Sequence, residues 1–270
     1  MLCYTCIKEC YRPLRQMAML PKPIGGKAIM RLQIDNVTKK YGSTYALNDL
    51  SLSIESGGIF GLVGRNGAGK STLMKILVTL EKPAEGTVRL DDIDIIKNPN
   101  AIRRVLGYLP QDAAIYPNLT SFEFLSYVAA MKGIGKKAAV KHINELLDML
   151  NLAAAKKKRL SSYSGGMRQR VGIACALLGM PEIIIMDEPS TGLDPEERYN
   201  LRQLLMELAK TRIVILSTHI ISDIESAASN LAVMNSGRLL YTGDVQSFAL
   251  SENGDIESAY LKLIHKGEAR

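Results

Sequence analysis

The chain has 270 residues, of which 47% are hydrophobic and 23% are charged, and its formal net charge is +7. A chain of this size buries a large core as one domain, or as one domain with an inserted lobe, and its composition excludes a fibrous repeat or a disordered protein. Its longest apolar runs, such as VGIACALLGM, are shorter than the roughly 20 residues of a membrane-spanning helix. We therefore expect a globular chain that does not itself cross a bilayer.

The positive charge is spread along the chain except for one dense block, KKKR at residues 156–159. Such a block is typical of a solvated helix end, where cations complement the helix dipole. An anionic lipid surface or a nucleic acid is the alternative partner for it. Because the rest of the charge is diffuse, we expect no nucleic-acid partner.

Residues 1–30 show no sustained periodicity, and regular patterning begins directly after Met30. We expect this segment to be a disordered extension outside the fold, and we hypothesise that it lies upstream of the native start. Three of its cysteines have the spacing C-x2-C-x3-C, which suits a metal site only weakly because no fourth ligand is near. They are Cys3, Cys6 and Cys10.

Short strand patterns follow, RLQIDNV, LSLSI and GIFGLV, and the last of them runs into GRNGAGKST at Gly64–Thr72. This segment matches the phosphate loop G-x4-G-K-[ST], between a strand and the helix pattern TLMKILVTL. Its backbone N–H groups would converge on phosphates, its lysine would supply a positive charge, and the Ser71 hydroxyl would ligate Mg²⁺. The expected phosphate-binding residues are Gly64, Asn66, Gly67, Gly69, Lys70, Ser71 and Thr72.

Helical patterns follow the strand pattern VLGYLPQ. Thr120 and Glu123 have the spacing of a capping box, which predicts a helix over SFEFLSYVAAMK that stops at the glycines of residues 133–135. A second helix has apolar residues on one face, at Val140, Ile143, Leu146, Leu147 and Leu150. We therefore expect residues of about 112–160 to form a helical lobe inserted into an α/β core.

The stretch YSGGMRQR, Tyr163–Arg170, precedes an apolar helix that we expect to end at Pro181. A Ser-Gly-Gly step that opens a helix suits an anion, because the first turn has unpaired N–H groups and the positive end of the dipole. This is a second anion site in a chain that already has a phosphate loop.

Strands and helices then alternate, which predicts a parallel sheet with crossover helices. EIIIMDE is a buried strand that ends in two acids, of which Asp187 would ligate the Mg²⁺ held by Ser71 and Glu188 would lie beside the attacking water. The helix PEERYNLRQLLMELAK, the strand RIVILST and a helix toward Ala228 follow. LAVMNSGRLLYTG predicts a hairpin around Ser236, and an amphipathic stretch, DIESAYLKLI, closes the chain.

The order of these motifs, from the phosphate loop through YSGGMRQR and IIIMDEPSTGLDP to STH, resembles the ATP-binding subunit of ABC transporters between about Arg31 and Gly243. The resemblance implies an α/β fold: a phosphate-loop NTPase core with a mostly parallel sheet, an N-terminal antiparallel β part and an inserted helical lobe. It implies an ATPase domain at residues 31–245 and a helical tail at 246–270. ATP and Mg²⁺ are the implied cofactors.

The resemblance also assigns roles to three residues that have ordinary alternatives. Tyr41 would stack on adenine, or be a turn aromatic beside a glycine. Gln111 would act in catalysis and on the metal at the join between core and lobe, or be a polar loop residue. His219 would contact the γ-phosphate, or pack under a helix start.

YSGGMRQR resembles the family signature, which closes over the ATP of a second subunit. Ser164, Gly165 and Gly166 would supply the hydroxyl and N–H donors, so the resemblance implies a head-to-tail dimer, homo or hetero. Tyr163 and Met167 depart from the commonest pattern, Leu-Ser-Gly-Gly-Gln, and we expect activity to survive. In STGLDP, residues 190–195, the resemblance implies a contact across the dimer, and Asp194 is also a good helix N-cap.

The function implied is ATP hydrolysis that powers transport through a separate integral membrane permease, most like the ABC-2 exporter type, at the cytoplasmic face of the cell membrane. The alternative is a soluble ABC ATPase that acts on a cytoplasmic assembly, such as iron–sulfur cluster maturation. The signature, and the lack of an Asn-Lys-x-Asp motif, argue against a generic phosphate-loop kinase or GTPase.

Overall fold

The computed structural model describes residues 29–252 and 254–268. Residues 1–28, which hold the three clustered cysteines and most of the expected extension, lie outside the described residues. Met30 is already tied to the fold, because its N–H donates to Oγ of Ser56 over 3.0 Å and its carbonyl accepts from the Ser56 N–H over 2.9 Å.

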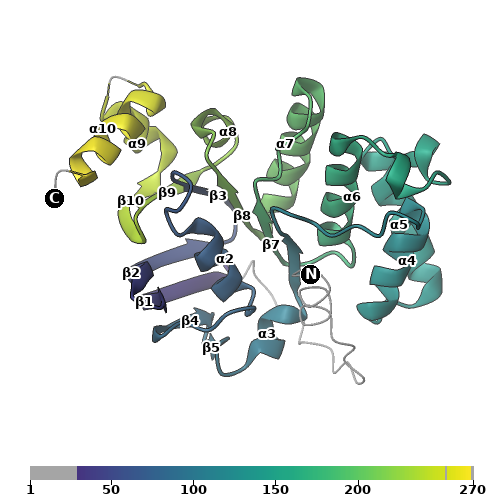
Figure 1. Ribbon diagram of the computed structural model, residues 1–270, viewed down its shortest axis with the longest axis horizontal. Helices are drawn as coiled ribbons and strands as arrows, with labels where there is room; N and C mark the ends of the chain where they lie inside the picture. The colour runs from purple at the N-terminus through teal and green to yellow at the C-terminus, as the bar shows by residue number, and fades with distance from the viewer. Residues whose placement is uncertain (1–28, 253, 269–270) are drawn as a thin grey trace.

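The first sheet is antiparallel, with the strand order β2-β1-β4-β5, and Figure 1 shows it at the lower left of the molecule. Its strands are β1 (Arg31–Tyr41), β2 (Thr44–Glu55), β4 (Glu85–Leu90) and β5 (Ile93–Asp94). The sequence analysis missed β4 and β5. Strand β4 buries only Val88 and Leu90, so its apolar pattern is too short to stand out.

The second sheet has the order β10-β9-β3-β8-β7-β6, in which only the β9–β10 pair is antiparallel. Its strands are β3 (Gly58–Val63), β6 (Leu106–Leu109), β7 (Ile183–Asp187), β8 (Ile213–Thr218), β9 (Asn230–Asn235) and β10 (Arg238–Asp244). The predicted mostly parallel sheet and antiparallel N-terminal part are both confirmed. The hairpin turn has positive φ at Ser236 and Gly237, as its sequence predicts.

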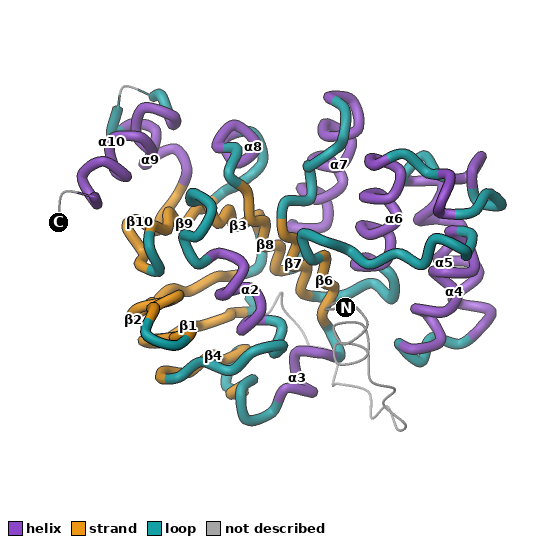
Figure 2. The backbone as a smooth tube through the Cα atoms, in the orientation of Figure 1, coloured by secondary structure: helices purple, strands orange, loops and turns teal. Residues whose placement is uncertain are grey.

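Helices lie against both sheets and at both ends of the molecule, as Figure 2 shows. They are α2 (Lys70–Leu77), α3 (Pro99–Arg103), α4 (Ser121–Met131), α5 (Lys136–Met149), α6 (Gly165–Leu177), α7 (Pro195–Ala209), α8 (Ile221–Glu225), α9 (Val245–Leu250) and α10 (Ile256–Glu268), with 3-10 turns η1 (Ala153–Ala155) and η2 (Leu160–Ser162). No helix within the described ranges has the length and apolarity to span a membrane.

Three helix predictions differ from the structure. Helix α6 ends at Leu177 rather than at Pro181, because Gly179 and Met180 adopt the left-handed backbone region, which stops a helix. Helix α8 ends at Glu225, before Ala228. The block KKKR begins at the C-cap of the short 3-10 turn η1, so the predicted helix end is that of a 3-10 turn and not of an α-helix.

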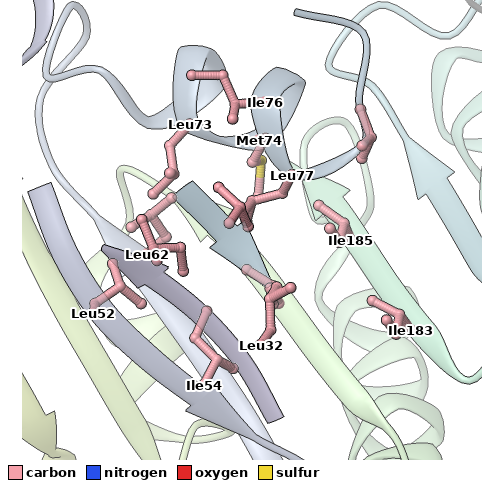
Figure 3. Close-up of a cluster of buried hydrophobic side chains, with 14 of the residues drawn as sticks. Leu32, Leu52, Ile54, Leu62, Leu73, Met74, Ile76, Leu77, Ile183 and Ile185 are labelled. Atoms are coloured by element: carbon pink, nitrogen blue, oxygen red, sulfur yellow. The ribbon is translucent and has the colours of Figure 1, made fainter. Parts of the chain in front are cut away.

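One core lies between the antiparallel sheet, helix α2 and one face of the parallel sheet, and Figure 3 shows part of it. Alternate residues of β7 explain its unbroken apolar run. Ile183 and Ile185 point into this core, whereas Ile184 and Met186 belong to a second core on the other face. A strand of a parallel sheet that is covered on both faces is apolar throughout.

The second core joins the parallel sheet to helices α4, α5, α6 and α7, so the lobe shares its core with the sheet. Ile143, Leu146 and Leu147 are buried there, as predicted, but Val140 is 39% exposed. Ala139, one residue earlier, is buried in its place. The 3.6-residue period allows either position near the start of the helix, and packing of α5 against α4 and α6 selects the smaller side chain.

The capping box at the start of α4 gives a first testable prediction. The Oγ1 of Thr120 accepts from the Glu123 N–H over 3.2 Å, and Oε2 of Glu123 accepts from the Thr120 N–H over 2.8 Å. Thr120→Ala should lower the free energy of unfolding by about 1 kcal/mol, because the Glu123 N–H loses its partner, and Glu123→Ala removes the reciprocal acceptor of the Thr120 N–H. Urea denaturation of both single variants and the double variant checks this; fully additive losses would contradict a reciprocal box.

Candidate nucleotide site

The predicted phosphate-loop, metal-binding and catalytic residues gather at one edge of the parallel sheet, where its strands end. Val63 of β3 pairs with Thr218 of β8, and Asp187 of β7 pairs with Ser217 of β8. The residues that follow these strand ends therefore lie side by side. The carboxyl edge of a parallel sheet is where ligands bind in open α/β folds, and Figure 1 shows α2 starting at this edge.

The phosphate loop owes its shape to glycines that no other residue could replace. A Cβ on Gly64 would come within 2.5 Å of the Met234 carbonyl oxygen, and one on Gly69 within 2.5 Å of the Ala46 carbonyl oxygen. Gly67 and Gly69 have positive φ, of 81° and 102°. This backbone presents successive N–H groups at the start of α2, which is the arrangement that a phosphate binds.

Lys70 is the first residue of α2 and is 6% exposed. Its Nζ donates to the carbonyl oxygens of Gly64, over 2.6 Å, and Arg65, over 3.2 Å. Burial lowers the pKa of Lys70, and the nearby carboxylates of Glu188 and Asp187 oppose that shift. A buried ammonium group in a phosphate loop is well placed to neutralise phosphate oxygens.

Asp187 lies at the end of β7, is 3% exposed and accepts a hydrogen bond from the Ser217 hydroxyl. Ser71 follows Lys70 on α2. In the described part of the chain, no cluster of three or more His, Cys, Asp or Glu side chains could hold a metal ion by itself. One carboxylate and one hydroxyl nevertheless fit Mg²⁺, which usually takes one or two carboxylates and completes its shell with phosphate oxygens and waters.

Glu188 has the most unusual environment at this edge. Its Oε1 lies 2.9 Å from Nδ1 of His219, and its backbone φ is 52°. Its Oε2 is buried and has no hydrogen-bond partner among the described residues. A buried carboxylate oxygen without a partner is costly. This oxygen fits a reaction in which it holds a water molecule beside a bound phosphate.

Tyr41 ends β1 and lies beside the start of α2. Its hydroxyl donates to Glu81, which also pairs with Lys39 over 3.2 Å and with Lys75 over 3.8 Å. Partial burial of the hydroxyl, and then the bond to and charge of Glu81, raise the pKa of Tyr41 to about 12. The ammonium of Lys39 lies 5.3 Å from the ring centroid, while 48% of the residue remains exposed for a stacking partner.

Gln111 follows β6 by two residues, at the point where the chain leaves the sheet for α4. Its side chain is exposed. This position agrees with the predicted join between core and lobe. The structure thus brings Gln111 to the same sheet edge as the loop that follows β7.

The Ser-Gly-Gly step opens α6 as predicted. Ser164 is the N-cap, and its Oγ accepts from the Met167 N–H over 3.2 Å. Gly165 is open, whereas a Cβ on Gly166 would lie 2.9 Å from the Gly192 carbonyl oxygen. Figure 1 shows α6 and α2 on opposite sides of β7. The signature segment, Ser164–Gly166, therefore lies away from the phosphate loop of its own chain.

Sequence reasoning missed three residues of the site. Ser217 holds Asp187, Glu81 binds Tyr41, and Gln169 donates to the carbonyls beside Glu188. Ser217 and Gln169 lie inside the motifs STH and YSGGMRQR, but the motifs by themselves predict no role for either residue. Glu81 has no local signal, because only the fold brings it to a residue 40 positions away.

Comparison with known proteins agrees with this geometry. The family model for ABC transporters matches residues 47–191. The chain is 33% identical over 231 residues to the uncharacterized ABC transporter ATP-binding protein YxlF of Bacillus subtilis (strain 168), covering 86% of this chain and 77% of that protein. It is 38% identical over 211 residues to the bacitracin transport ATP-binding protein BcrA of Bacillus licheniformis, covering 77% of this chain and 68% of that protein.

Solved structures agree as well. An ATP-binding subunit of an ABC transporter superposes with a TM-score of 0.79 at 28% identity, covering 86% of this chain and 99% of that one. A dimeric post-hydrolysis structure of the ATP-binding cassette MJ0796, bound to ADP and Pi, superposes with a TM-score of 0.73 at 30% identity. The match covers 79% of this chain and 98% of that one.

The fold and the site define a phosphate-loop ATPase of the cassette type. The chain belongs to the ABC transporter family, as one of its ATP-binding subunits. The predicted resemblance and fold class are both confirmed.

Proposed function

We propose that this chain hydrolyses ATP to power export of a substrate across a membrane through a separate transmembrane partner, to which it binds at the cytoplasmic face. The observation that carries the ATPase part is the buried Oε2 of Glu188, which has no partner within residues 29–252 and 254–268 and whose carboxylate is near Lys70 of the phosphate loop. Support for transport comes from relatives named for bacitracin transport and linearmycin resistance. The YSGGMRQR variant of the signature and the DIESAYLKLI tail favour the ABC-2 exporter type.

The chain's own residues divide the chemistry between them. The phosphate-loop N–H groups and Lys70 would bind and orient the phosphates, and Asp187, Ser71 and Gln111 would hold Mg²⁺. The metal, when bound, neutralises charge on the phosphate oxygens. Glu188 would take a proton from the attacking water. His219, which lies against Glu188, would orient that carboxylate and reach the γ-phosphate.

A second ATPase subunit completes the site in this proposal. The chain has one phosphate loop, which opens α2, and one signature segment, which opens α6, and these two helices lie on opposite sides of β7. Two subunits placed head to tail would bring each signature segment to the other's phosphate loop, and a C2 arrangement closes such a pair. The dimeric structures of MJ0796 support this assembly.

Co-purification from the native cell tests the transport role. We expect the tagged protein, taken from detergent-solubilised membranes, to bring down a multi-span membrane protein in stoichiometric amount, as identified by mass spectrometry. A tagged Lys70→Ala variant controls for partners that bind only through nucleotide. Recovery from the soluble fraction with cytoplasmic partners alone would refute the transport role, favour the soluble alternative and leave the ATPase chemistry standing.

A further inference from the structure

Helix α6 begins at the signature segment, and its second turn reaches the catalytic edge of the same chain. The Nε2 of Gln169 donates to the carbonyl oxygen of Glu188 over 3.3 Å and to that of Pro189 over 3.2 Å. These two carbonyls belong to the first two peptide groups after the Cα of Glu188. Helix α6, whose signature segment would contact the ATP of the partner subunit, is therefore hydrogen-bonded to Glu188, which would act on the ATP of its own chain.

The backbone that Gln169 contacts is strained. Glu188 has a φ of 52°, which few residues other than glycine, asparagine and aspartate adopt. Such a conformation persists only where its surroundings hold it. The Glu188 N–H donates to the Ser217 carbonyl over 3.1 Å, and the Glu188 carbonyl accepts from the Thr191 N–H over 3.2 Å. Gln169 adds the contact that comes from α6.

Arg170, the next residue of α6, connects the same helical turn to two other parts of the structure. The guanidinium of Arg170 lies 2.6 Å from Oε1 of Glu197 on α7, and it also donates to the Leu150 carbonyl over 2.9 Å at the end of α5, in the helical lobe. Both side chains of the ion pair are mostly buried. Arg170 thus ties α6 to α7 and to the lobe, and Gln169 ties the same helix to the backbone of Glu188.

We propose that Gln169 is a positioning residue that couples the signature segment to the orientation of the Glu188 carboxylate. The proposal rests on the head-to-tail dimer of the proposed function. Closure of Ser164–Gly166 over the partner's nucleotide fixes the start of α6, and Gln169 then holds the backbone of Glu188 in its strained form. Each chain thus sets its own catalytic carboxylate according to whether its signature segment is engaged.

Two substitutions of Gln169 by side chains of similar length separate the effect of its hydrogen-bond donation from the effect of its packing. Gln169→Glu keeps the shape but loses the N–H donors and sets a carboxylate against two carbonyls, whereas Gln169→Lys restores a donor. Asn144→Ala is the matched control, because the Asn144 amide donates to a backbone carbonyl, that of Val140, over 2.9 Å within α5.

Steady-state ATPase kinetics on the full chain, with crosslinking of the ATP-bound dimer, give the readout. We expect Gln169→Glu to lower kcat about ten- to hundredfold, with KM and dimer yield unchanged. Gln169→Lys should recover most of kcat, and Asn144→Ala should match the wild type. Circular dichroism confirms that each variant is folded.

Two results would overturn the coupling role, and a third would overturn the proposed function on which it rests. One is a wild-type kcat in Gln169→Glu, which leaves the proposed ATPase function intact. Another is a parallel loss of kcat and dimer that Gln169→Lys does not restore, which assigns Gln169 to packing alone. A folded wild-type chain with no ATPase activity, with or without its membrane partner, would instead remove the proposed function itself.

Discussion

Replacing Glu188 with glutamine should leave ATP binding intact and lower turnover by about 10²- to 10⁴-fold, the range that a positioned general base contributes. Glutamine keeps the length and hydrogen-bonding capacity of the side chain but does not accept the proton of the attacking water. The buried Oε2, which has no partner among the described residues, is the atom that this substitution disables. Single-turnover and steady-state ATPase assays measure the effect.

The same variant should trap the ATP-bound dimer, because hydrolysis no longer releases it. Size-exclusion chromatography with ATP and Mg²⁺ should show the dimer for Glu188→Gln and mostly monomer for the wild type. Glu182→Gln is a suitable control, because Glu182 precedes the same strand at its opposite end, away from the site. A Glu188→Gln chain that turns over at the wild-type rate would exclude Glu188 as the base.

Replacing Lys70 with alanine should weaken ATP binding by about 10- to 150-fold, the value of a lost hydrogen bond to a charged group at about 1.5–3 kcal/mol. The Lys70 ammonium is buried in the phosphate loop and lies near two carboxylates. Without it, the phosphates meet those negative charges uncompensated. Titration with a fluorescent ATP analogue gives the dissociation constant.

Lys75→Ala is the control for this experiment, because Lys75 lies one turn and a half further along α2 and pairs with Glu81 instead. Its affinity for ATP should stay much closer to that of the wild type. Thermal unfolding without nucleotide should show that Lys70→Ala is folded. Equal ATP affinity for Lys70→Ala and the wild type would remove the lysine from phosphate binding.

Much of the fold could be predicted from local pattern. Both faces of β7 are buried, which explains why its residues before Asp187 are all apolar, and the predicted capping box does start α4. Helix ends and burial at single positions were predicted less well. Val140 and Ala139 both fit the helical period, and only the packing of α5 against α4 and α6 decides which of them is buried.

The phosphate loop, the two acids after a buried strand and the order of the motifs are predictable from the chain, because each depends on residues that are neighbours in it. The contact of Ser217 with Asp187 and that of Gln169 with the backbone of Glu188 became visible in the fold. These partners lie 30 and 19 positions apart. They meet because parallel strands end at one edge of the sheet and α6 packs across it, which no local pattern encodes.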